Sequence, residues 1–316
     1  MLKKYWLYIL LMSIVFCVFL FLSEDKSTIS TSDIFAVTDT SSVTKVFIAD
    51  RKGNTISLDK KDNNWTVNNK FYVRKDAINI LLSTIHQIKI QQPVSLGAFD
   101  NVIKNMSTTG VKVEIYAGEE VLKIYTVGNE TANHLGTYML LDDSNEPFIM
   151  HIPAFNGYLS PRYGIQGQII DEKTWRRRIV FDIEESKIHN ISISNLQEPE
   201  HSFTLQLHPT KLYDFDGSLT TFNNQSILHF ISSFKRINCE SFKNDRSKIE
   251  LATPLHELII NNDTLRTYAI GDSEERKKEE NFNVDRMYAI LNNGDLMLIQ
   301  NYVFNKVLIT IDELRK

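Results

Sequence analysis

One pattern of apolar residues occurs twice in this chain, and it restricts the folds that the chain can adopt. The first occurrence begins at Ile78, and the second, with the same spacing, begins at Ile227. Apolar residues three to four positions apart lie on one face of a helix. The two sets are Ile78, Leu81, Leu82, Ile85 and Ile88, and Ile227, Phe230, Ile231, Phe234 and Ile237. The sequence therefore predicts two amphipathic helices, over residues 75–88 and 224–237, each covering a core.

The segments around these helices correspond as well. Tyr125-Thr126-Val127-Gly128, for example, has a counterpart in Tyr268-Ala269-Ile270-Gly271. Apolar and polar residues alternate in the flanking runs, which is typical of antiparallel strands with one buried face. We expect turns at 117–118, 142–145 and 261–263. The predicted fold class is α+β, with two tandem repeats, each a largely antiparallel β-sheet with one amphipathic helix on a face.

This pattern divides the chain into five parts. We expect a transmembrane helix over 1–22, a flexible tether over 23–33, a first repeat over 34–165, a linker over 166–178 and a second repeat over 179–316. Within the linker, Asp171 is suited to cap a short helix. Trp175, which is large and apolar, is expected to lie between the repeats.

The N-terminal segment has the features of a membrane anchor. An apolar run extends from Tyr5 to Leu22, long enough as a helix to span about 27 Å of a hydrocarbon core about 30 Å thick. Lys3 and Lys4 precede it, and the positive-inside bias then leaves the remainder of the chain outside the cytoplasm. We therefore expect a single-pass protein of the bacterial inner membrane with a periplasmic C-terminal part.

Two other interpretations of this segment stay open. A cleaved signal peptide fits less well, because the run exceeds the usual apolar length and no small residues mark a cleavage site near Ser23. A lipid-modified cysteine at Cys17 would follow Phe16, where a small residue is the usual neighbour. Cys239 is the one cysteine outside the apolar run, so it has no partner for an intramolecular disulfide there. We expect it to be a buried apolar residue.

Composition and motifs exclude several classes of function. The chain has 35 basic and 39 acidic residues, a net charge of −4, so a nucleic-acid binder that works through overall charge is not expected. Phosphate-binding glycine loops, the serine-hydrolase motif and closely spaced histidine pairs do not occur. We therefore expect no enzyme, no catalytic residue, no metal and no cofactor.

Two stretches are candidate partner-binding surfaces. The rigid aromatic loop over 152–163 offers Tyr158, Arg162 and Tyr163 as anchors. The favoured alternative is that this loop closes the first sheet, with Arg162 against the ring of Tyr158 or Tyr163. The basic run contains Arg176 and Arg177, which can instead pair with nearby carboxylates such as Asp171, Glu184 or Glu185. A mixed charge run over 274–280 is either a partner-contact loop or a tolerated surface insertion.

A third candidate is a cleft between the repeats, because clefts between domains are common ligand sites. The polar residues that we expect to serve it are His201, His208, Asp214 and Asp216. Asp214 and Asp216 also occur in a weak calcium-loop pattern that lacks the later acidic ligands.

The sequence resembles a bacterial domain-of-unknown-function family of membrane-anchored envelope proteins with a repeated α+β unit. The residues that carry the resemblance are Thr44 to Asp50, Gly110 to Tyr116, Gly136 to Leu140 and Gly157 to Tyr163. Wider relatives of that family occur with auxiliary components of gliding-motility-type ABC transporters. The resemblance implies an accessory role in the envelope and supplies no catalytic residues.

The sequence therefore favours a membrane-anchored extracytoplasmic interaction or accessory protein, whose partner is another envelope protein, such as a transporter subunit. The alternative is a ligand-binding or hydrolytic module that uses the cleft between the repeats. A mechanical spacer is a weaker third hypothesis.

Overall fold

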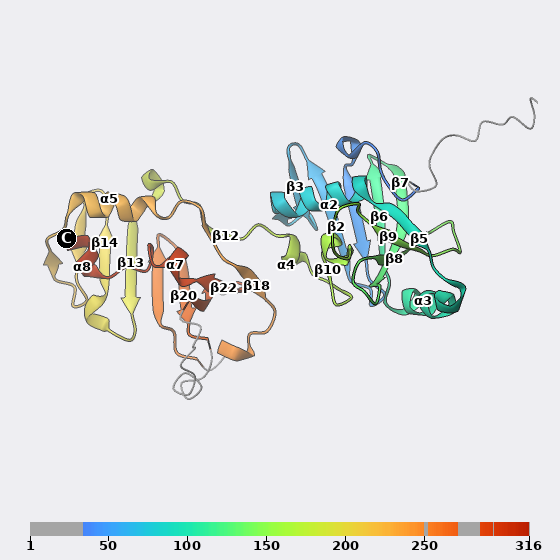
Figure 1. Ribbon diagram of the computed structural model, residues 1–316. Helices are drawn as coiled ribbons and strands as arrows, with labels where there is room; N and C mark the ends of the chain where they lie inside the picture. The colour runs from blue at the N-terminus through green and yellow to red at the C-terminus, as the bar shows by residue number, and fades with distance from the viewer. Residues whose placement is uncertain (1–33, 250–251, 271–284, 293, 316) are drawn as a thin grey trace, which may run out of the picture. The chain divides into compact units, whose positions relative to one another are not determined.

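The chain divides into two compact units, with the boundary between Trp175 and Arg176. The computed structural model describes residues 34–249, 252–270, 285–292 and 294–315 (Figure 1). In Figure 1 the first unit runs from blue to green and the second from yellow to red. The boundary falls inside the expected linker, 166–178, most of which belongs to the first unit.

The first unit is built on one nine-stranded antiparallel sheet. Its strands lie in the order β4-β3-β2-β1-β6-β7-β8-β9-β5. Their bounds are β1 (Lys45–Ala49), β2 (Thr55–Lys61), β3 (Asn64–Val67), β4 (Phe71–Tyr72), β5 (Lys89–Pro93), β6 (Val111–Ala117), β7 (Glu120–Glu130), β8 (Thr137–Leu141) and β9 (Phe148–His151). The turns expected at 117–118 and 142–145 connect β6 to β7 and β8 to β9.

The predicted first helix covers one face of this sheet. It is α2 (Lys75–Gln87), and its stripe residues Ile78, Leu81 and Ile85 are buried. They pack in one core with alternate strand residues such as Val46 and Ile48 of β1. The residues that repeat with a period of 3.6 on the helix and those that repeat with a period of 2 on the strand thus pack in the same core, as the sequence predicts.

A second helix, which the sequence pattern did not predict, packs on the other face. It is α3 (Leu96–Thr109), whose Val102 and Met106 contact Tyr138 and Leu140 of β8. Tyr138 and Leu140 are the neighbours of Met139, which belongs to the main core. Because side chains alternate along a strand, Tyr138 and Leu140 point to the opposite side of the sheet. The first unit therefore has three layers over part of its sheet.

Short elements complete the first unit. They are the 3₁₀ turns η3 (Thr40–Ser42) and η4 (Ser160–Tyr163), the hairpin β10 (Ile165–Gln166) and β11 (Ile169–Ile170), and α4 (Glu172–Trp175). Asp171 caps α4 as predicted, accepting a hydrogen bond from the Lys173 amide at 2.9 Å. Trp175 was expected between the repeats, but it is buried in the first unit's core, and its carbonyl accepts from the Arg74 amide at 2.8 Å.

The second unit has a nine-stranded antiparallel sheet of its own, in the order β16-β15-β14-β13-β19-β20-β21-β22-β18. The strands are β13 (Asn190–Asn195), β14 (Phe203–Gln206), β15 (Lys211–Tyr213), β16 (Leu219–Thr220), β18 (Ser241–Lys243), β19 (His256–Ile260), β20 (Asp263–Tyr268), β21 (Arg286–Leu291) and β22 (Leu296–Gln300), with β12 (Ile179–Phe181) and β17 (Ile237–Asn238) forming a separate pair. The helices are α5 (Asn224–Ser232), α7 (Asn301–Phe304) and α8 (Ile311–Arg315), and the 3₁₀ turns are η5 (Glu185–Lys187), η6 (Pro199–His201) and η7 (Ser247–Ile249).

The two sheets have the same topology. When the strands of each sheet are numbered along the chain, both orders read 4-3-2-1-6-7-8-9-5. In both units the helix with the apolar stripe comes after the fourth and before the fifth of these strands along the chain. The stripe residues Ile227, Phe230 and Ile231 are buried in the second core, as their counterparts are in the first.

The predicted second helix ends earlier than expected. It was predicted to reach residue 237, but α5 ends at Ser232. The hydroxyls of Ser232 and Ser233 both donate to the His229 carbonyl, and Arg236 has a left-handed backbone with φ of 60°. Ile237 then starts a strand, although it is buried in the core as the stripe predicts.

The predicted anchor over 1–22 and tether over 23–33 lie outside the described residues. Within the described part of the chain, no helix has the length and apolar character needed to span a membrane.

Candidate functional site

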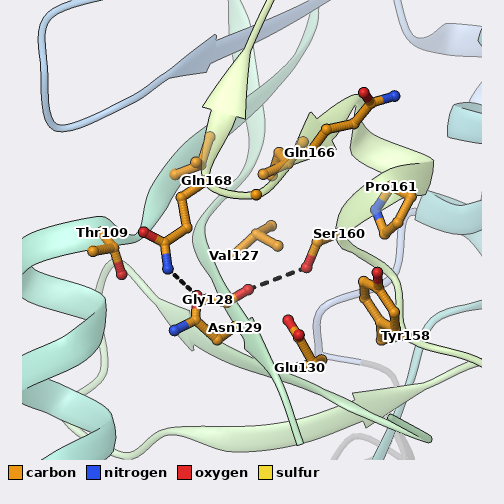
Figure 2. Close-up of a pocket in the computed structure, with 13 residues that line it drawn as sticks. Thr109, Val127, Gly128, Asn129, Glu130, Tyr158, Ser160, Pro161, Gln166 and Gln168 are labelled. Carbon is orange, nitrogen blue, oxygen red and sulfur yellow. Dashed lines mark hydrogen bonds between the residues drawn. The ribbon is translucent and has the colours of Figure 1, made fainter.

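A pocket of about 600 Å³ lies in the first unit (Figure 2). Four segments form its walls: the C-terminal end of α3, the end of β7, the segment of Tyr158 to Pro161, and the β10–β11 hairpin. The end of α3 and the end of β7 are distant in the sequence from each other and from residues 158–168, and the three regions meet only in the fold. A volume of this size is within the range of small-molecule sites.

An irregularity in β7 shapes the first wall. The pairing of β7 with β8 shifts between Val127 and Glu130, so that Gly128 and Asn129 form a bulge. The Gly128 carbonyl accepts a hydrogen bond from Ser160 Oγ at 3.2 Å. A Cβ at position 128 would lie 3.0 Å from the Tyr138 carbonyl oxygen, so the close approach favours glycine. Bulges bend strands and redirect side chains, and this one presents Asn129 and Glu130 to the pocket.

The β10–β11 hairpin forms the opposite wall. Its two loop residues, Gly167 and Gln168, both have positive φ, of 55° and 65°, as a type I′ hairpin turn requires. The Gln168 side chain reaches across, and its Nε2 donates to Asn129 Oδ1 at 3.1 Å (Figure 2). The hairpin is thereby tied to the bulge.

The lining is mainly polar and carries little charge. Apolar side chains come from Val111, Val127, Pro161 and Ile165, whereas polar groups come from Thr109, Asn129, Glu130, Tyr158, Ser160, Gln166 and Gln168. Glu130 is the one lining residue that is charged at neutral pH, and its Oε1 lies 3.9 Å from His134 Nδ1. The pocket therefore offers hydroxyls, carboxamides and one carboxylate.

Glu130 and Ser160 are lining residues of types that act in hydrolases. A glycosidase-type mechanism needs two carboxyl groups, and the pocket lining holds one. Ser160 Oγ is engaged with a carbonyl, and no lining histidine stands beside it as a base. Cys239, in the second unit, is buried as predicted, and burial raises the pKa of its thiol to about 11, so it is not an activated nucleophile.

The predicted docking loop contributes only partly to an exposed surface. Tyr158 is half-buried and lines the pocket. Tyr163 is fully buried, with its hydroxyl 2.9 Å from that of Tyr125. Burial raises the pKa of both phenols. Tyr163 is therefore a core residue and not a contact residue, because its hydroxyl finds a partner inside the fold.

Arg162 belongs to the closure of the first sheet. Its Nε donates to Thr84 Oγ1 at 2.7 Å, and its guanidinium lies over the Phe155 ring, 4.8 Å from the ring centre. The expected aromatic contact thus exists, but to Phe155 instead of to Tyr158 or Tyr163.

The three arginines of the basic run, Arg176 to Arg178, lie in the second unit. Arg176 is paired with a carboxylate, that of Asp295, at 2.6 Å. Its guanidinium also lies 4.3 Å from the Phe242 ring centre. Arg177 is half-buried. The charge run over 274–280 lies outside the described residues.

Three of the four predicted cleft residues belong to one polar network around α8. His201 Nδ1 lies 3.6 Å from Asp312, which pairs with Arg315 at 3.6 Å, and Arg315 lies 3.9 Å from Asp214. Asp214 and Asp216 both accept from the Ser218 amide. Side-chain hydrogen bonding with Asp214 and with Ser218 lowers the pKa of Asp216 below its ordinary value.

His208 lies elsewhere, in a pocket of about 420 Å³ whose lining does not include the other three residues. That pocket also contains His189 and Asn261, and Asn261 Oδ1 accepts from the His189 amide at 2.9 Å. Among the residues that the structure describes, no group of three or more His, Cys, Asp or Glu side chains could hold a metal ion.

A scan against models of protein families and searches of curated proteins and of solved structures find no match to this chain.

Sequence reasoning missed the pocket. Its second wall was assigned to the linker, since residues 166–178 showed no long strand. The available signal was Gly167-Gln168 between Ile165-Gln166 and Ile169-Ile170, a two-residue loop that starts with glycine between two short apolar runs.

Proposed function

We propose that the protein is a single-pass, membrane-anchored interaction protein of the bacterial envelope that serves an envelope assembly or transporter as an accessory subunit. Its C-terminal part, from residue 34, would lie in the periplasm. The partner would be another envelope protein. The role that we propose for the protein does not include catalysis.

The observation that carries this proposal is the combination of an N-terminal apolar run with two units of one topology. The run from Tyr5 to Leu22 is long enough for an anchor, and Lys3 and Lys4 orient it. Both units share the strand order 4-3-2-1-6-7-8-9-5, which supports two copies of one α+β repeat. A repeated scaffold on an anchor suits the presentation of surfaces to a partner.

The envelope family resemblance points in the same direction. The residues that carry it include Gly110 to Tyr116, which form β6 with its preceding glycine, and Gly157 to Tyr163, which border the pocket. An accessory role with an ABC-type transporter is the specific form of the proposal that this resemblance favours.

Photo-crosslinking in cells tests the partner. A benzoyl-phenylalanine would replace Tyr158, and further probes would be placed within 274–280. The matched control replaces Tyr302, an aromatic residue of the second unit that is 76% exposed. We expect one dominant membrane protein to be captured from the test positions and not from position 302. Capture of nothing above background from any test position would contradict the proposal.

A second candidate function is ligand binding at the pocket of the first unit, a site that contains none of the four residues expected for a cleft between the repeats. The polar lining and the tie between Gln168 and Asn129 suit a small polar ligand. Hydrolysis is the less favoured form of this alternative, because Glu130 has no second carboxylate beside it in the lining.

A further inference from the structure

We propose that the pocket of the first unit binds a neutral, hydroxyl-rich ligand, a saccharide unit, without cleaving it. The inference deepens the ligand-binding alternative above and does not depend on the identity of a protein partner.

The electrostatics of the pocket disfavour an anionic ligand. No lysine, arginine or histidine is among its lining residues, and Glu130 contributes a negative charge. Thr109, the last residue of α3, also lines it, so the negative end of a 14-residue helix dipole faces the same region. A phosphate or carboxylate group would meet repulsion here without a compensating cation.

The polar groups match hydroxyls better than they match a cation. The side-chain amides of Asn129, Gln166 and Gln168 each combine an NH2 donor with a carbonyl acceptor. Sugar hydroxyls can likewise both donate and accept hydrogen bonds. A cationic ligand would call for several carboxylates, whereas the lining has one, and that one already lies within 3.9 Å of His134 Nδ1. The lining therefore favours an uncharged polyol over an amine.

The pocket also has an apolar part. Val111, Val127 and Ile165 are buried residues that contribute to the lining, and Tyr158 adds an aromatic ring. A sugar ring has an apolar C–H face in addition to its hydroxyl edge, so it can use both kinds of surface. Small-molecule sites generally combine an apolar surface with a few placed polar groups.

The turn of the β10–β11 hairpin places the side chain of Gln168 across the pocket. Gln168 has φ of 65°, a conformation that costs a side-chain-bearing residue energy and that favours Gly, Asn or Asp. Its side chain is exposed, and it donates a hydrogen bond to Asn129 across the pocket.

Saturation-transfer NMR and calorimetry with defined sugars test the proposal. The full-length protein would be held in a polyoxyethylene detergent, which has no sugar headgroup. The neutral probes are maltose, cellobiose and N,N′-diacetylchitobiose, the cationic probe is glucosamine, and the anionic probe is glucose 6-phosphate. We expect at least one neutral sugar to bind, and both charged sugars to bind more weakly or not at all. Binding of no neutral sugar, or tighter binding of a charged one, would overturn the proposal.

Three variants locate the binding. Gln168→Gly and Asn129→Ala should each weaken the binding of the neutral sugar about three- to tenfold, the loss of one or two hydrogen bonds. Gln92→Ala replaces an exposed glutamine of β5 that does not line the pocket, and it should leave the affinity for the neutral sugar unchanged. Gln168→Gly should also leave the unfolding temperature unchanged or higher, because glycine relieves the strain. Sugar binding that is indifferent to both pocket variants would place it elsewhere and overturn the assignment.

This outcome is separable from that of the proposed accessory role. Loss of sugar binding in Gln168→Gly with crosslinking from 274–280 unchanged would support the ligand site. Absence of a captured partner with sugar binding intact would contradict only the accessory role.

Discussion

At the scale of single residues, the buried pair of Tyr125 and Tyr163 gives the clearest prediction about stability. Both rings are fully buried, their centres are 6.0 Å apart in an edge-to-face arrangement, and their hydroxyls are 2.9 Å apart. Each hydroxyl is the partner that makes burial of the other tolerable, since an unpaired buried hydroxyl costs about 1–3 kcal/mol.

Replacing both tyrosines of this pair should therefore cost less than the sum of the two single replacements. Tyr163→Phe and Tyr125→Phe should each lower the free energy of unfolding by about 1–3 kcal/mol, and the double variant should lose less than the sum. Urea denaturation of the three variants measures this coupling. Strict additivity would contradict the paired arrangement.

The same pair predicts a dependence of stability on pH. Burial raises the pKa of both phenols above the ordinary value of about 10, so the folded state holds these protons more tightly than the unfolded chain does. Their contribution to stability is therefore complete below about pH 10 and is lost as the pH rises above it. Denaturation between about pH 8 and 11 checks this, with the double phenylalanine variant as the control, which should show a smaller loss.

At the scale of elements, the start of α5 depends on a cap. Asn223 Oδ1 accepts from the amides of Gln225 and Ser226, at 2.8 and 3.4 Å. Asn223→Ala should lower the free energy of unfolding by about 1 kcal/mol, whereas Asn223→Ser, which retains a capping oxygen, should cost less. Chemical denaturation measures both, and equal losses in the two variants would argue against the cap.

The elements also show how far sequence reasoning reaches. The stripe of α2 and the hairpin turns were predictable, because they follow from local periodicity and turn chemistry. α3 was missed because only Val102 and Met106 of its residues are fully buried, too few to form a stripe. β5 was missed because its residues are mostly exposed and do not alternate.

The candidate site was less predictable than the fold. The sequence showed Tyr163 as an aromatic beside an arginine, but its burial depends on Tyr125, which belongs to a distant strand. The pocket depends on a bulge in the pairing of β7 with β8 and on a hairpin that folds back to it, and neither appears in a pattern along one segment. Contacts between segments, rather than local preference, decide such a site.

At the scale of the whole molecule, each unit has a core of its own. Leu81→Ala, at a fully buried position of α2, should destabilise the first unit by about 2–5 kcal/mol. Ile80→Ala, at a position of the same helix where the side chain is 42% exposed, should cost much less. Thermal unfolding with peptide-resolved hydrogen exchange checks this: protection should fall in 45–151 and persist in the second core. An equal loss in both units would contradict separate cores.

The claim on which the functional account rests is that the part of the chain after residue 34 lies outside the cytoplasm. The most direct measurement is an alkaline phosphatase fusion after Lys316 in a bacterial host, compared with a β-galactosidase fusion at the same position. The account predicts active phosphatase in the membrane fraction and inactive β-galactosidase. Active β-galactosidase with inactive phosphatase would place both units in the cytoplasm and contradict the account.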